Sequence, residues 1–167
     1  RGLREGDNPA RWKGYLDKVL PAPGKVQEVK HHPALPYAQM GTFMADLRTK
    51  TAMGARALEF AILTAVRSGE ARGARWNEID LDAKVWTVPA ERMKSSRKEH
   101  RVPLSDAAVE MLKDLPRMEG NDLVFPAQRG KNPLSDNTLT KLIADMHAAS
   151  VKRGGVGYLD PKQGKVA

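Results

Sequence analysis

The 167-residue sequence contains no cysteine, so it can form neither a disulfide framework nor a thiolate metal site. It has no apolar run long enough to cross a bilayer, and its first residues, RGLREGDNPARW, lack the pattern of a secretory signal peptide. These absences argue against a disulfide-stabilised secreted domain and against a helical membrane protein. We therefore expect a soluble protein of the cytoplasm with no membrane partner.

Positive charge is in excess and is concentrated in three segments. The formal net charge is +8. Residues 1–33 carry seven Lys/Arg against four Asp/Glu, residues 91–101 carry five against two, and residues 152–165 carry four against one. Basic segments on a nearly neutral body favour a polyanionic partner such as DNA. Solvated tails and a solvated turn would give the same pattern.

Prolines and glycines divide the chain into an irregular start and a regular body. Four prolines fall within the first 33 residues, which predicts a linker or extended arm with one short helix at most, over residues 12–20. Apolar residues at helical spacing predict four helices beyond it, on the stripes 40–47, 58–65, 108–115 and 139–146. We expect Pro36 to begin the first helix, Arg67 to close the second, and Ser105 and Ser135 to cap the last two.

Strand signals are few. Val85–Val88 and Arg101–Leu104 predict a hairpin with a long basic turn, and Leu123–Phe125 is a short apolar piece. The last fourteen residues, GGVGYLDPKQGKVA, contain four glycines and one proline and predict a flexible connector. The expected fold is mainly α with a small antiparallel β-sheet, an α+β class.

One arginine follows the second apolar stripe, and a glutamate comes three residues later. Glu70 is placed to orient the side chain of Arg67. Phosphodiester cleavage needs fixed positive charge against the non-bridging oxygens, and a guanidinium supplies it without losing its proton. The pattern fits a phosphate-binding arginine or an ordinary structural Arg–Glu pair at a helix end.

The turn between the two expected strands is rich in hydrogen-bond donors. It reads MKSSRKEHR over residues 93–101. A lysine in such a turn can reach a leaving oxygen and donate a proton to it. Lys94 is the first candidate for this role and Lys98 the second, and a solvated hairpin tip is the alternative for the whole turn.

These residues carry a family resemblance. The segment Leu63–Arg75, LTAVRSGEARGAR, followed by Trp76, resembles the box that holds the first catalytic arginine of tyrosine recombinases, especially prophage and genomic-island integrases. Arg92–Leu104 resembles the family's second and third strands with the lysine turn between them. PLSDAA, LVFPAQRG and Leu134–Met146 follow in the family's order, so the resemblance covers about residues 34–160.

The resemblance implies both an architecture and a set of site residues. Residues 34–167 would be the N-terminal part of a tyrosine recombinase catalytic domain, with the DNA breaking-rejoining enzyme fold, and residues 1–33 a linker at the end of a core-binding domain. Arg67 would bind the phosphate, Glu70 would support it, and Lys94 would protonate the 5′ oxygen. The candidate DNA contacts are Arg92, Arg97, Lys98, His100 and Arg101.

In that family a tyrosine attacks the scissile phosphate, forms a 3′-phosphotyrosine and frees a 5′ hydroxyl, and covalent catalysis of this kind splits one hard displacement into two easier ones. The resemblance therefore implies site-specific recombination, by integration or excision of mobile DNA at attachment sites on a bacterial chromosome. It implies double-stranded DNA as the partner, an oligomer on that DNA, and neither a cofactor nor a metal. The alternatives are a non-catalytic DNA-binding module, a decayed integrase remnant, or a generic helical interaction domain.

Two parts of the family's active site have no match in this sequence. None of the four histidines is followed by arginine at the third position, so the H-x-x-R box is missing. Tyr158 is the only tyrosine after Arg67, and it precedes the place where that box is expected, so we interpret it as structural. We expect a catalytic domain truncated before the H-x-x-R box and the nucleophilic tyrosine, and inactive by itself.

Acidic residues offer one competing hypothesis. Glu78, Asp80 and Asp82 alternate just ahead of an expected strand, and clustered carboxylates can bind Mg²⁺ as in a two-metal nuclease. The same sequence, NEIDLD, is more typical of a capped turn. We therefore expect no metal site.

Overall fold

The structure is a computed structural model, and it describes residues 6–22, 31–93, 98–128 and 132–167. Two units are distinguished, residues 1–32 and residues 33–167. In the first unit, the regular element among the described residues is one 3₁₀ turn, η1 (Leu16–Lys18). The helix expected over residues 12–20 is thus reduced to a single turn. Trp12 and Tyr15 remain about 40% exposed, and a short helix that buries no face is marginal in water.

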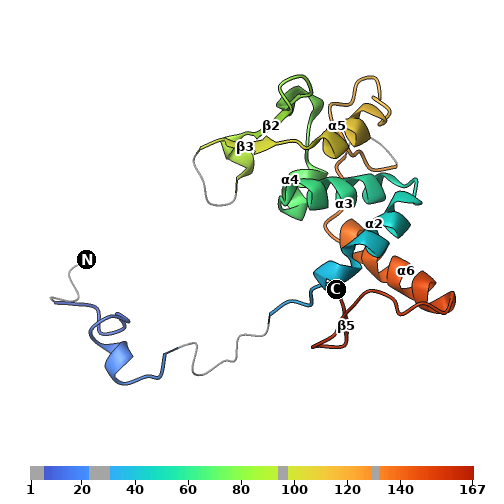
Figure 1. Ribbon diagram of the computed structural model, residues 1–167. Helices are drawn as coiled ribbons and strands as arrows, with labels where there is room; N and C mark the ends of the chain where they lie inside the picture. The colour runs from blue at the N-terminus through green and yellow to red at the C-terminus, as the bar shows by residue number, and fades with distance from the viewer. Residues whose placement is uncertain (1–5, 23–30, 94–97, 129–131) are drawn as a thin grey trace. The chain divides into compact units, whose positions relative to one another are not determined.

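The second unit is mainly helical, as the apolar periodicity predicts. Its α-helices are α2 (Met40–Arg48), α3 (Met53–Thr64), α4 (Ser68–Arg72), α5 (Asp106–Lys113) and α6 (Thr138–Lys152). Three 3₁₀ turns join them: η2 (Tyr37–Gln39), η3 (Trp76–Glu78) and η4 (Ala90–Arg92). Figure 1 shows α3 across the middle of this unit, where it contacts α2, α4, α5 and α6.

The centre of the unit is buried because α3 is apolar on nearly every side. Six of its residues are buried, including Phe60, which is fully covered. Gly54 allows α3 to approach α6 closely, since a Cβ at this position would lie 2.9 Å from the Thr138 methyl carbon. The helix is therefore the fixed support from which α4 and the sheet are placed.

The small sheet is antiparallel and has the strand order β1-β2-β3. Its strands are β1 (Ile79–Asp80), β2 (Val85–Val88) and β3 (His100–Pro103). Trp86 pairs with Val102 in the register, and both are buried. The Trp86 ring lies 5.0 Å from that of Phe60, which ties the sheet to α3. The predicted α+β class and the hairpin are confirmed, with β1 as an additional edge strand.

Three expectations about helix ends were wrong. Pro36 does not begin α2, which starts at Met40; Pro36 is instead the N-cap of the preceding 3₁₀ turn η2. Arg67 does not close α3, because α3 ends at Thr64 and Arg67 is the N-cap of α4. Ser135 does not cap α6, whose N-cap is Asn137; the Ser135 hydroxyl instead hydrogen-bonds that of Thr138 over 2.9 Å. Ser105 does cap α5 as predicted, because its side chain accepts from the backbone N–H of Ala108.

The last fourteen residues are not a flexible connector. They form a hairpin of β4 (Leu159–Asp160) and β5 (Lys165–Val166). The Asp160 carboxylate accepts from the backbone N–H groups of Ala34, Lys162 and Gln163, and these bonds outweigh desolvation and lower the pKa of Asp160. The glycines of this segment therefore belong to defined turns. No helix in the described parts of the chain is long and apolar enough to span a membrane.

Candidate functional site

The backbone turns sharply between α3 and the helix that carries the candidate arginine. Ala65 ends α3 in the left-handed conformation, with φ 53° and ψ 28°. Arg67 then adopts an extended conformation, with φ −69° and ψ 146°, and α4 begins at the next residue. This geometry places the Arg67 side chain at the N-terminal end of α4, where the helix dipole is positive.

The Glu70 carboxylate holds Arg67 through both of its oxygens. One oxygen accepts from Nη1 of Arg67 at 2.9 Å, and the other accepts from the Arg67 backbone N–H at 3.3 Å. The Glu70 side chain is 8% exposed, whereas that of Arg67 is 62% exposed. The guanidinium is therefore fixed on one side by a buried acid and open to solvent on the other, where it can receive an anion.

The hairpin carries the predicted DNA-contacting residues that the structure describes. His100 and Arg101 lie exposed on β3, opposite Val88 and Thr87 of β2, and Lys98 is exposed just before the strand. Lys94 and Arg97 lie outside the described residues. Part of the predicted basic surface thus lies on β3, and the next residue of that strand, Val102, is buried and anchors the strand to the core.

Arg92 is positioned differently from the other predicted contacts, because its guanidinium is bound within the protein. Nη1 lies 2.5 and 2.6 Å from the two carboxylate oxygens of Glu78, and Nη2 donates to the backbone carbonyl of Glu70 at 2.7 Å. Its side chain is 22% exposed. The structure therefore joins η4, at the base of the basic turn, to α4.

The carboxylate of Glu78 was not singled out from the sequence as part of this site. It also accepts from the indole Nε1 of Trp86 at 3.0 Å and from the backbone N–H of Arg75 at 3.1 Å. The indole N–H of a buried tryptophan usually donates a hydrogen bond, so a tryptophan expected in the core indicates that a carboxylate or carbonyl lies near it. The sequence could not identify that partner, because only the folded sheet brings Glu78 next to Trp86 and Arg92.

The acidic residues near β1 form a capped turn, in agreement with the more typical interpretation of NEIDLD. One carboxylate oxygen of Asp80 accepts from the backbone N–H groups of Asp82 and Ala83, at 3.1 and 2.8 Å. Glu78 is engaged by Arg92. Among the residues that the structure describes, no group of three His, Asp or Glu side chains is arranged to hold a metal ion.

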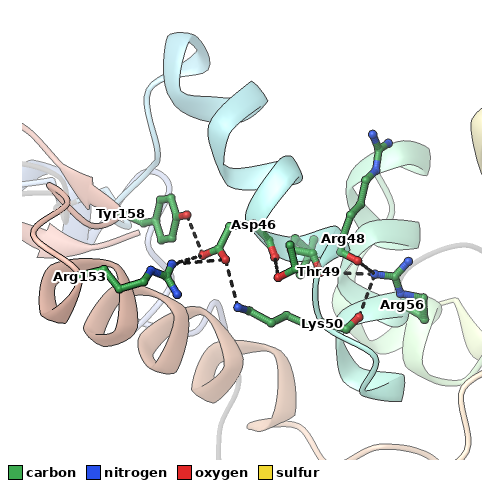
Figure 2. Close-up of polar contacts among 8 residues, drawn as sticks. Asp46, Arg48, Thr49, Lys50, Arg56, Arg153 and Tyr158 are labelled. Atoms are coloured by element: carbon green, nitrogen blue, oxygen red, sulfur yellow. Dashed lines mark hydrogen bonds and ion pairs between the residues drawn. The ribbon is translucent and has the colours of Figure 1, made fainter.

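Tyr158 lies in the core and not on an exposed edge. It is 4% exposed, packs edge-on against Phe43 with ring centroids 4.9 Å apart, and donates its hydroxyl to Asp46 at 2.9 Å (Figure 2). Burial and the hydrogen bond to the Asp46 carboxylate raise the pKa of Tyr158. A phenol held neutral in this way is a poor nucleophile, which agrees with a structural role.

Comparison with known proteins assigns a class to this fold. The integrase of the Tn1549 transposon, solved in complex with transposon right-end DNA, superposes with a TM-score of 0.62 at 12% identity over 96% of this chain and 55% of that one. A lambda integrase tetramer bound to a Holliday junction gives a TM-score of 0.50 at 18% identity over 70% of this chain and 34% of that one. The fold is that of a tyrosine recombinase catalytic domain.

The family follows from the sequence comparison. Residues 34–156 match the model of the phage integrase family. The prophage integrase IntA of Escherichia coli is 36% identical over 132 residues, which are 77% of this chain and 30% of IntA. The chain therefore belongs to the phage integrase family of tyrosine recombinases. It spans between 30% and 38% of the length of the curated relatives that it matches.

Proposed function

We propose that this chain is the arginine-and-lysine half of the catalytic domain of a site-specific tyrosine recombinase that integrates or excises mobile DNA. One observation supports this proposal more strongly than any other. The Arg67 guanidinium is largely exposed, yet its orientation is fixed by the buried carboxylate of Glu70. A purely structural ion pair needs no open guanidinium face, whereas a phosphate-binding group does.

In the proposed reaction Arg67 binds a non-bridging oxygen of the scissile phosphate, and Glu70 keeps its guanidinium in place. A tyrosine oxygen attacks phosphorus and loses its proton, the bond from phosphorus to the 5′ oxygen breaks, and Lys94 gives a proton to that oxygen. The Arg67 charge stabilises the additional negative charge that builds up on the phosphate oxygens. Lys98 is the second candidate for the proton donor.

The nucleophile of this reaction is proposed to come from the rest of a longer protein, together with an H-x-x-R box. The buried phenol of Tyr158 supports this assignment, since it is held by Asp46 within the fold. We accordingly propose that residues 34–167 alone do not cleave DNA. Residues 1–33 would belong to the linker that follows a core-binding domain.

The proposed partner is double-stranded DNA at an attachment site of a bacterial chromosome, bound in the cytoplasm. The exposed Lys98, His100 and Arg101, together with Arg97, would contact phosphates. The Tn1549 and lambda integrases were solved on DNA, and the latter as a tetramer, which supports a DNA-bound oligomer for the complete protein. Neither a metal nor a cofactor takes part in the proposed steps.

The test uses the full-length integrase that contains this chain and a nicked attachment-site duplex that traps the covalent protein–DNA adduct. Arg67→Ala should slow adduct formation by about 100-fold or more, because it removes charge stabilisation at the phosphate. Lys94→Ala should abolish cleavage while DNA binding is largely retained. Arg75→Ala, a change at another exposed arginine, is the matched control. DNA binding without any adduct from the wild-type protein would instead favour a non-catalytic DNA-binding module.

A further inference from the structure

Arg92 is held by three hydrogen bonds that leave little of its guanidinium for a ligand. Two of them go to the Glu78 carboxylate, at 2.5 and 2.6 Å, and the third goes to the backbone carbonyl of Glu70, at 2.7 Å. Glu78 is 8% exposed. The Arg92 side chain is only 22% exposed, against 62% for Arg67, so little of its guanidinium is accessible to a phosphate. This arrangement does not suit a DNA contact.

The anchor for Arg92 is part of the protein core. The Glu78 carboxylate accepts from the indole N–H of Trp86 at 3.0 Å, and Trp86 is fully buried between β2 and α3. The position of the Arg92 guanidinium is therefore set by the packing of the sheet on α3. Nη1 donates to Glu78 and Nη2 donates to the Glu70 carbonyl, so two nitrogens of one planar group are held, and the direction of the guanidinium is fixed as well as its position.

The other end of this connection is the residue that holds Arg67. Arg92 binds the carbonyl of Glu70, and the side chain of Glu70 binds Arg67. Helix α4 has only five residues, too few to be stable without tertiary contacts. A displacement of Arg92 would thus move Glu70 and, through it, the guanidinium of Arg67.

We propose that Arg92 is a positioning residue for phosphate activation: its Glu78-anchored guanidinium fixes α4 and thereby sets the orientation of Arg67. The inference rests on the proposed function, and it replaces the assignment of Arg92 as a phosphate contact. It predicts that the shape of the guanidinium matters and not merely its charge.

Gly73 offers a way to disturb Arg92 without changing any charge. A Cβ at Gly73 would lie 2.9 Å from Nη2 and 3.4 Å from the central carbon of the Arg92 guanidinium, so Gly73→Ala must displace that group. The backbone of Gly73 has φ −96°, which alanine adopts easily. Gly41→Ala is the matched control, because a Cβ there meets nothing within 4 Å.

The experiment compares Arg92→Lys, Glu78→Gln, Gly73→Ala and Gly41→Ala in the full-length integrase, on two nicked substrates. One substrate has an ordinary scissile phosphodiester, and the other has a neutral methylphosphonate at that position. Without the phosphate charge, an arginine has less charge to stabilise, so the Arg67→Ala defect should be smaller on the methylphosphonate. The rates are measured below the unfolding temperature of each variant.

We expect Arg92→Lys and Glu78→Gln to slow cleavage of the phosphodiester by about 10-fold or more, since small misplacements of a catalytic group cost that much, and Gly73→Ala to do so more mildly. Each defect should shrink on the methylphosphonate, as for Arg67→Ala. DNA affinity and its salt dependence should match the wild type. Gly41→Ala should cleave both substrates normally.

Three outcomes would overturn the inference. Equal defects on both substrates would mean a general loss of structure. Normal cleavage by Arg92→Lys, or a smaller salt dependence of DNA binding by that variant, would mean that Arg92 acts through its charge on DNA. Failure of the proposed function has a different signature, because the wild type would then form no adduct or Arg67→Ala would cleave as well as the wild type.

Discussion

The hydroxyl of Tyr158 donates a hydrogen bond to the carboxylate of Asp46 over 2.9 Å, and so joins the segment after α6 to helix α2. Lys50, at 3.0 Å, and Arg153, at 3.4 Å, contact the same carboxylate (Figure 2). Three donors from two distant parts of the chain thus converge on one acid. This cluster makes the last hairpin part of the folded unit.

Removal of the Tyr158 hydroxyl should weaken that connection. Tyr158→Phe keeps the ring packed on Phe43 but takes one hydrogen bond from a charged acceptor, so we expect a loss of about 1–2 kcal/mol in the free energy of unfolding. Urea denaturation followed by circular dichroism measures it. Tyr37→Phe is the control, because Tyr37 is 92% exposed. Equal stability of the two variants would contradict the structural role of the Tyr158 hydroxyl.

The same cluster should make stability depend on acid pH. Burial opposes ionisation of Asp46, but hydrogen bonds from Lys50 and Tyr158 and the charges of Lys50 and Arg153 outweigh it, so the pKa of Asp46 is lowered from 3.8. The unfolded state then binds the proton more tightly, and stability is lost as the pH falls below about 4.

Asp46→Asn should reduce this acid dependence, measured as the thermal midpoint between about pH 5 and pH 2. Asp82→Asn, on the exposed turn after β1, is the control and should keep the acid dependence of the wild type. An Asp46→Asn profile parallel to that of the wild type would show that the Asp46 carboxylate does not contribute to the acid transition.

A second buried acid joins α2 to α3. Glu59 is 3% exposed and contacts Nε of Arg48 at 2.7 Å and Nη1 of Arg56 at 2.9 Å, while Arg56 also donates to carbonyls at the end of α2. Glu59→Gln would leave two arginines without their counter-charge. Because the Arg48 side chain is 52% exposed, solvent offsets part of this effect, and we expect a loss of about 1–3 kcal/mol in the free energy of unfolding.

Chemical denaturation measures the Glu59→Gln effect, with Glu110→Gln on the exposed face of α5 as the matched control. The control should change stability by less than about 0.5 kcal/mol. A Glu59→Gln midpoint within error of the control would mean that the two arginines are satisfied by solvent and by backbone carbonyls.

The exposed face of β3 gives a prediction about DNA. If Arg101 contacts one phosphate, Arg101→Ala should reduce the slope of log affinity against log salt by about 0.9 without changing sequence preference. Arg117→Ala is the control, because the Arg117 guanidinium lies over the ring of Trp76, 4.5 Å from its centroid. Fluorescence anisotropy with labelled duplexes at several salt concentrations provides both slopes. Identical slopes for Arg101→Ala and the wild type would exclude this contact.

The parts of the fold that depend on local chemistry were predictable. The apolar stripes located α2, α3, α5 and α6, and Ser105 capped α5 because a serine hydroxyl can reach the N–H three residues later. The C-terminal hairpin was missed because its glycines suggest flexibility. Gly157 and Gly164 instead adopt φ 69° and 63°, which tight turns require and which glycine adopts without strain.

The candidate site was predictable only where its residues are close in sequence. Arg67 and Glu70 are three residues apart on one turn of chain, so their contact follows from spacing. Glu78 and Arg92 are fourteen residues apart, and their ion pair depends on how β1 and β2 pair. Sequence patterns therefore predicted the contact between Arg67 and Glu70 but not the ion pair between Arg92 and Glu78.

The left-handed backbone conformation of Ala65 affects how narrowly the direction of α4 is defined. An alanine at φ 53° costs roughly 1 kcal/mol relative to glycine, which adopts this conformation freely. Glycine would also admit mirror-image conformations that send the following residues away from α3 in other directions. The alanine admits far fewer, so we expect the backbone at this junction to hold α4 in one direction relative to α3.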